Sequence, residues 1–256
     1  MKFSRFVLAS IIIPLILCAA DKDRDIPGLY GGIKPSDYVT GRFVPEKNLL
    51  FSSLKKSGIP AKGDWHFLRK EAIASLKKLY DDFHAGHPGE PFLVRSSTRN
   101  FLSQKGIWES KWKEFSSRMK IKSNDEKAPA SVASAILRYS SMPGTSRHHW
   151  GTDFDLNELN NQYFESGKGR VLYDWLKKNA ARYGFCQPYT AGRKSGYEEE
   201  KWHWSYMPLS KKFLEEWNKL YESDPGAFSR RGLFTGSEIS GRRSHEFANE
   251  INGDCR

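Results

Sequence analysis

The chain has 256 residues, and Lys+Arg 41 against Asp+Glu 30 give a formal net charge of +11. Aromatic residues make up 14% of the chain, with 8 Trp, 11 Tyr and 16 Phe, which is too much apolar surface for a disordered protein. This composition also excludes collagen, coiled coils and polytopic membrane proteins. The length allows one large domain that buries a sizeable core of its own.

The first 20 residues have the three parts of a secretory signal peptide. Lys2 and Arg5 precede the apolar run from Phe6 to Leu17, and Cys18-Ala19-Ala20 follows it. A transmembrane helix needs roughly 20 apolar residues, so this run is too short to be one. We therefore expect residues 1–20 to be a signal peptide and the protein to be exported, to the periplasm or cell envelope. The run also resembles a lipoprotein signal, so a lipid anchor at Cys18 is the alternative.

Export places the chain where disulfides persist. With Cys18 removed or lipidated, Cys186 and Cys255 remain. Spacing alone does not decide between a bridge and two free thiols. The absence of Cys-x-x-Cys from the sequence excludes a thiolate zinc ribbon.

The N-terminal half predicts an extension followed by two helices. Residues 21–63 are rich in Gly, Pro, Lys and Ser without a period, which indicates an exposed N-terminal extension. After Asp64, a candidate N-cap, apolar residues recur at helical spacing from Leu68 to Phe83 and predict an amphipathic helix. Residues 92–94 predict a strand, residues 101–115 a second helix and residues 120–127 a polar loop.

The C-terminal half alternates in the same way. Apolar spacing over residues 172–183 predicts a helix that Gly184 ends, and the aromatic-rich segments 185–189 and 201–207 predict extended chain. Ser210 is expected to cap a last helix, and residues 226–256 to form a mobile basic tail. Helices interspersed with short strands favour a single α+β domain over residues 64–225.

The positive charge makes nucleic acid the first partner to consider. The basic residues are scattered along the chain, however, and export leads the protein away from nucleic acid. We expect no nucleic-acid partner and a monomer whose solvated surface tolerates an anionic cell envelope.

Two segments each join a histidine to a carboxylate. His148 precedes Asp155, and His203 follows Glu200 by three residues. On a continuous helix His148 and Asp155 would lie roughly 10 Å apart, too far to share an ion. They converge only if the chain reverses, which Gly151 permits. Of the remaining histidines, those at positions 66, 84, 87 and 245 are predicted to lie on the surface.

The pattern Ser146-x-His148-x-x-Gly151-x-x-x-Asp155 followed by Glu200-x-Trp202-His203 resembles zinc D-alanyl-D-alanine carboxypeptidases of the VanY type. Their group also contains VanX and the hedgehog amino-terminal domain. The resemblance implies a small, mainly antiparallel sheet packed by helices and bearing one Zn²⁺ ion. It makes His148, Asp155 and His203 the metal ligands and Glu200 the catalytic base, which takes a proton from water and passes it to the leaving amine. Its substrate would be the peptidoglycan stem peptide.

The family's substrate element has a weaker counterpart upstream, in Ser97-Thr98-Arg99 with Gln104 five residues later. The resemblance makes Arg99, Gln104 and Ser146 candidates for binding substrate. A planar guanidinium pairs with a carboxylate in a bidentate way that lysine cannot match. Thr98 stands where the family usually has Tyr, which changes the expected shape of the pocket.

Asp153 replaces the small residue, commonly Ala, that usually stands two positions before the zinc aspartate. It can orient a ligand histidine from behind or bind the metal in place of Asp155, and the motif's register favours Asp155. Two functional alternatives also stay open. One is an endopeptidase that cuts within the stem peptide, and the other is a non-catalytic zinc module that binds wall fragments or a protein.

Serine peptidases that act on the same substrate need a Ser-x-Asn motif and a Lys-Thr-Gly motif in addition to Ser-x-x-Lys. The chain has Ser-x-x-Lys at residues 52–55 and 75–78 but no Ser-x-Asn. Helix-borne zinc proteases need His-Glu-x-x-His, and the stretch from His245 to Asn249 lacks the second histidine. We therefore expect neither mechanism.

Overall fold

The computed structural model describes residues 28–120 and 127–256. The predicted signal peptide, Cys18 and most of the predicted loop 120–127 lie outside the described residues. A four-stranded antiparallel sheet has the order β3-β4-β6-β5, with bounds β3 (Val94–Ser96), β4 (Asp153–Leu156), β6 (His203–Tyr206) and β5 (Phe185–Cys186). A second, two-stranded sheet pairs β1 (Phe51–Ser53) with β2 (Phe67–Arg69).

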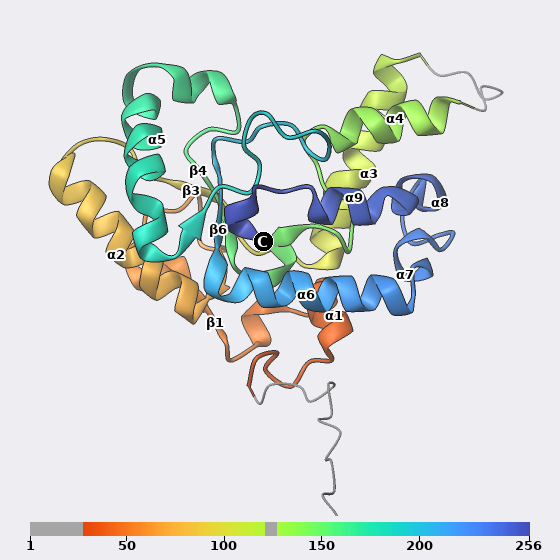
Figure 1. Ribbon diagram of the computed structural model, residues 1–256, viewed down its shortest axis with the longest axis horizontal. Helices are drawn as coiled ribbons and strands as arrows, with labels where there is room; N and C mark the ends of the chain where they lie inside the picture. Colours follow the sequence, from red (N-terminus) through yellow and green to blue (C-terminus); the bar gives the residue numbers. More distant parts are fainter. Residues whose placement is uncertain (1–27, 121–126) are drawn as a thin grey trace, which may run out of the picture.

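Helices surround the larger sheet (Figure 1). The α-helices are α1 (Pro35–Val39), α2 (Lys70–Gly86), α3 (Phe101–Arg118), α4 (Ala128–Leu137), α5 (Gly167–Asn179), α6 (Met207–Ser223), α7 (Gly226–Ser229), α8 (Ser237–Ser240) and α9 (Ser244–Asn249). The 3-10 helices are η1 (Pro45–Lys47), η2 (Leu54–Ser57), η3 (Arg147–Trp150), η4 (Asn161–Glu165), η5 (Ala180–Tyr183), η6 (Gly241–Arg243) and η7 (Gly253–Cys255). In Figure 1, α2 and α5 lie on one side of the sheet and α3, α4 and α9 on the other. The predicted α+β class, with a small antiparallel sheet packed by helices, is confirmed.

The two central strands separate a polar face from an apolar one. Successive side chains of a strand point to opposite faces, so Phe154 and Trp204 share one face and Asp155 and His203 the other. Phe154 and Trp204 belong to an apolar cluster with residues of α2 and α5. The opposite face carries the polar pairs Asp155↔His203 and Asp153↔Ser205. Packing on one face therefore holds in register the residues that could act on the other.

The predicted helices are present, with shifted boundaries. Phe67–Arg69, expected within the first helix, is instead strand β2 paired with β1, and the helix begins at Lys70. A long-range strand pair here overrides the local helical spacing, in which Leu68 fits both patterns. The last helix begins at Met207 with Pro208 in its first turn, three residues before the expected cap at Ser210. Helix α4 was not predicted.

The C-terminal segment is the main departure from the sequence expectation. Residues 226–256, predicted as a mobile tail, form α7, α8, α9 and two 3-10 helices. Its aromatic residues Phe228, Phe234 and Phe247 are buried in the core, and Cys255 forms a disulfide with Cys186. Arginines are abundant in this segment, so its few apolar residues form no visible pattern in the sequence. In the fold, those apolar residues pack against α6 and α3. Residues 28–63 also contribute to this core, through Tyr38 and Val39. Within the described ranges, no helix combines the length and apolarity needed to cross a membrane.

Candidate metal centre and substrate cavity

A chain reversal at Gly151 brings His148 and Asp155 together, as the sequence predicts. Gly151 ends η3 at φ 75°, in the left-handed region, and the chain then enters β4. A Cβ atom at this position would lie 2.3 Å from Cε1 of Phe51. Both the backbone angle and the close contact therefore require glycine.

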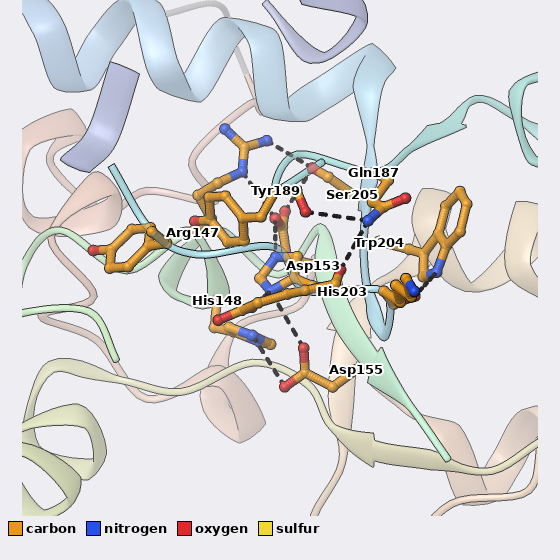
Figure 2. Close-up of polar contacts among 12 residues, drawn as sticks. Arg147, His148, Asp153, Asp155, Gln187, Tyr189, His203, Trp204 and Ser205 are labelled. Carbon is orange, nitrogen blue, oxygen red and sulfur yellow. Dashed lines mark hydrogen bonds and ion pairs between the residues drawn. The ribbon is translucent and has the colours of Figure 1, made fainter. Parts of the chain in front are cut away.

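Strand register supplies the third side chain. Asp155 of β4 lies directly opposite His203 of β6. His148 Nε2 lies 3.4 Å from Asp155 Oδ2, and His203 Nδ1 lies 3.3 Å from Asp155 Oδ1. The two imidazole rings meet edge to face with centroids 4.7 Å apart. Residues from two strands and a preceding turn thus converge on one point (Figure 2).

Two of the ligand-atom distances fit a tetrahedral zinc ion. His148, Asp155 and His203 each offer one ligand atom, and these atoms all lie within 4.8 Å of one another. Zinc bonds of about 2.0–2.1 Å in tetrahedral geometry place neighbouring ligand atoms about 3.3–3.4 Å apart, which matches the two distances above. Asp155 Oδ1 is buried and makes no hydrogen bond within the described chain. This oxygen lies 3.3 Å from His203 Nδ1, and a cation bound between them would satisfy it.

In each histidine, the ring nitrogen that points away from Asp155 has its own hydrogen-bond partner. His148 Nδ1 lies 2.8 Å from the Ser97 carbonyl oxygen, so it donates there and leaves Nε2 free for a metal. His203 Nε2 lies 2.9 Å from Asp153 Oδ2, which leaves Nδ1 facing Asp155. Such contacts fix the tautomer and the orientation of ligand imidazoles. Asp153 therefore lies behind His203, on the opposite side of the ring from Asp155.

The pKa values of the two histidines show how this site would accommodate a cation. Burial lowers the pKa of His148 below its ordinary value, so this imidazole is neutral. Burial alone would also lower the pKa of His203, but contacts with Asp153, Asp155 and Glu200 raise it well above its ordinary value. Binding of a metal at His203 Nδ1 would therefore release a proton.

Glu200 is buried beside this cluster. Its Oε2 lies 3.3 Å from His203 Nδ1, and burial raises the pKa of its carboxyl above the ordinary value. Its backbone N–H donates to the Tyr189 carbonyl, and Gln187 Nε2 donates to the Glu200 carbonyl. A raised pKa suits a group that accepts and returns a proton near neutral pH.

These groups open onto a cavity of about 560 Å³. It is lined by His148, Asp155, His203 and Glu200, and also by Arg99 and Lys111. Within the described ranges Arg99 has no ion-pair partner, and its Nε is buried without a hydrogen bond. Burial lowers the pKa of Lys111, and the nearby Arg99 lowers it further. The cavity thus combines the basic side chains of Arg99 and Lys111 with a proton acceptor beside the candidate metal position.

The other predicted substrate residues lie behind the cavity wall. Gln104 is buried on α3 and donates from Nε2 to the carbonyl of Ser141, a residue of the wall. Ser146 is fully buried, and its Oγ has no hydrogen-bond partner among the described residues. Neither residue lines the cavity, so their direct contact with substrate stays a prediction. The Thr98 hydroxyl donates to the Phe67 carbonyl, 2.5 Å away.

Sequence reasoning overlooked several residues around the site. His66, predicted on the surface, is buried and bonded to Ser97 Oγ at 3.0 Å, on the residue whose carbonyl holds His148. Tyr189 packs edge to face on His203 with centroids 4.8 Å apart. Lys111 follows Gln104 by seven residues on one helix, so two-turn spacing was the signal that could have found it.

With this geometry established, comparison with known proteins identifies the family. Residues 65–209, more than half of the chain, match the VanY family of D-alanyl-D-alanine carboxypeptidases. The chain belongs to this family, and the resemblance seen in the motifs is confirmed. The matched range contains all of the residues that converge on the candidate metal centre.

Individual relatives are more distant. The putative carboxypeptidase YodJ of Bacillus subtilis (strain 168) is 28% identical over 200 residues, covering 75% of this chain. The chain spans 60% of that relative's length. The structure of VanYB in complex with D-alanine-D-alanine is 23% identical, covers 64% of this chain and 82% of its own, and gives a TM-score of 0.46. The LdcB LD-carboxypeptidase is 20% identical, with coverages of 82% and 81% and a TM-score of 0.48.

Proposed function

We propose that this protein is an exported zinc peptidase that removes the C-terminal D-alanine from peptidoglycan stem peptides. The observation that carries the proposal is one cavity in which a His-Asp-His cluster, the carboxylate of Glu200 and the guanidinium of Arg99 are all present. Membership of the VanY family supports the substrate class. Export rests on the N-terminal sequence pattern, outside the described residues.

His148, Asp155 and His203 would hold one zinc ion. When bound, zinc would lower the pKa of a water molecule towards about 7 and polarise the scissile carbonyl. Glu200 accepts the proton of the attacking water and donates it to the leaving amine. Its Oε2 lies 3.3 Å from His203 Nδ1, and it is outside the His148-Asp155-His203 group, which supports a role as the base beside the ion.

Arg99 supports an exopeptidase rather than an endopeptidase. Arg99 lines the cavity and makes no ion pair within the described ranges, so its guanidinium is a strong site for the terminal carboxylate of a peptide. Lys111 lines the same cavity and adds a second positive charge. An internal peptide bond would leave both cations facing an uncharged chain. Cleavage next to a free carboxylate therefore matches the charge of the cavity better.

Glu200 also favours an enzyme over a non-catalytic zinc module. A module that only binds needs no proton acceptor. Burying a carboxylate beside Asp155 is electrostatically costly, because each carboxylate disfavours the charge of the other. The presence of this carboxylate in the cavity, at that electrostatic cost, supports a role in proton transfer.

The test is mass spectrometry of a stem pentapeptide ending in D-Ala-D-Ala after incubation with zinc-loaded protein. We expect loss of one terminal alanine with wild type and almost none with Glu200→Gln, which should still bind one zinc per chain. Glu198→Gln is the matched control, because Glu198 is exposed and two residues away in the same segment. His203→Ala should lose the metal together with the activity.

Cleavage within the peptide would show that the protein is an endopeptidase and not a carboxypeptidase. If the peptide stays intact although zinc is bound, the protein is either a non-catalytic binding module or an enzyme with another substrate. Unchanged hydrolysis by Glu200→Gln would remove this residue from the mechanism.

A further inference from the structure

A buried ion pair between Asp153 and Arg147 lies behind His203, and the proposed reaction does not use it directly. We call this pair and its hydrogen-bond partners the ionic unit. Asp153 Oδ2 accepts from Arg147 Nε and from His203 Nε2, both at 2.9 Å (Figure 2). Its Oδ1 accepts from Ser205 Oγ at 2.8 Å and from Thr152 Oγ1 at 2.6 Å. The side chain of Asp153 is 0% exposed and that of Arg147 1% exposed. Four donors thus surround one carboxylate from which water is excluded.

Arg147 has further contacts of its own, although its buried Nη1 has no hydrogen-bond partner among the described residues. Its Nη2 donates to Ser205 Oγ at 2.7 Å, and its guanidinium lies over the Trp150 ring, 4.7 Å from the centroid. Arg147 immediately precedes the ligand His148, and Ser205 lies two residues after His203 on β6. The unit therefore ties both histidine-bearing segments together from behind.

Asp153 is not available as a metal ligand in this arrangement. Each of its oxygens already accepts two hydrogen bonds, and it faces His203 Nε2, the nitrogen turned away from Asp155. Asp155 Oδ1, in contrast, has no hydrogen-bond donor among the described residues. The two aspartates of one strand therefore have different environments, although both point to the same face of the sheet.

We propose that Asp153 and Arg147 act together as positioning residues for the metal centre, with Asp153 holding the His203 ring so that Nδ1 faces the zinc position. This inference rests on the proposed metal site. A third buried carboxylate beside Asp155 and Glu200 would be strongly unfavourable alone, and Arg147 supplies the compensating charge.

The proposal separates metal affinity from folding stability. Asp153→Ala leaves Arg147 buried without its partner, and Arg147→Met leaves Asp153 uncompensated, so each single variant should be destabilised. The double variant Arg147→Met/Asp153→Ala removes both charges, and replacing a buried ion pair by apolar side chains often restores stability. If the unit positions His203, zinc affinity stays low even when stability returns.

The experiment is competition for zinc against a chromophoric chelator, with urea unfolding of the metal-free protein measured in parallel. We expect the double variant to be more stable than either single variant and to bind zinc about 10–100-fold more weakly than wild type, the usual effect of losing an outer partner of a ligand histidine. The matched control is Glu71→Gln, which removes the partner of the buried Arg69, 2.7 Å away. It should lower stability and leave zinc affinity unchanged.

A spectroscopic readout reports the contact itself. In wild type, the proton on His203 Nε2 should give a slowly exchanging, downfield imidazole resonance, and this resonance should disappear in the double variant. Wild-type zinc affinity in a stably folded double variant would overturn the inference while leaving the proposed function intact. A wild-type protein that binds no zinc would overturn the metal site, and the inference with it.

Discussion

The disulfide between Cys186 and Cys255 gives the sharpest test of how the C-terminal segment is held. It closes a loop with a sequence separation of 69 residues, which contains Glu200, β6 and α6. We consider the double variant Cys186→Ala/Cys255→Ala. Both cysteines are buried, at 6% and 0% exposure, so alanine is tolerated without burying a new polar group.

The size of the expected stability loss follows from the length of the loop that the disulfide closes. A cross-link removes chain entropy from the unfolded state in proportion to the logarithm of loop length, and for roughly 70 residues this amounts to about 4 kcal/mol at 25 °C. The native contacts of the segment should survive the substitution. Asn252 N–H donates to the Pro188 carbonyl at 2.8 Å, and Arg193 Nη1 donates to the Glu250 carbonyl at 2.6 Å. The double variant should therefore be less stable, while its candidate site stays largely intact.

The assay is urea unfolding in the presence of a metal chelator, because zinc would otherwise contribute its own binding energy. We expect a lower midpoint for the variant and for wild type treated with a reductant. Hydrolysis of the stem peptide under native conditions should be retained in substantial part. A loss below about 1 kcal/mol would refute the reasoning, because the bridge would then not constrain the unfolded chain.

Three further predictions follow from the site. Gly151→Ala should cost about 2–5 kcal/mol in urea unfolding, because it combines a left-handed backbone with a contact on Phe51, and a loss near zero would contradict the structure. Lys111→Met should raise KM for the stem peptide with little change in kcat, whereas Lys113→Met, on an exposed position of the same helix, should change neither. Saturating zinc at 100 times its Kd should raise the stability of wild type by about 2.7 kcal/mol over the chelated protein, and His203→Ala should show no such gain by calorimetry.

The sequence determined the chemical core of the site because that core is encoded locally. His148, Gly151 and Asp155 lie within one short segment, and Glu200 precedes His203 by three residues. Glycine at the reversal is a local steric requirement, so the convergence of His148 and Asp155 could be expected from the motif alone. The main helices were predictable for a similar reason, since helical spacing of apolar residues is visible within a single window.

Pairings between distant segments were not predictable in this way. Residues 67–69 continue the helical pattern in sequence but pair with residues 51–53 as a strand. The C-terminal segment looked like a solvated tail, because its few aromatic residues are diluted by arginines. Burial of Phe228 and Phe247 depends on the surface that α6 and α3 offer them, and no local pattern records that surface.

The same distinction holds within the site. From the sequence alone, Asp153 could either orient a ligand histidine or bind the metal, because its role depends on which nitrogen of His203 it meets across the sheet. Register decides this: Asp155 lies opposite His203, while Asp153 lies opposite Ser205 and contacts Arg147. Local spacing thus named the groups that can do the chemistry, whereas the tertiary structure alone decided which of them face the metal and which hold the others in place.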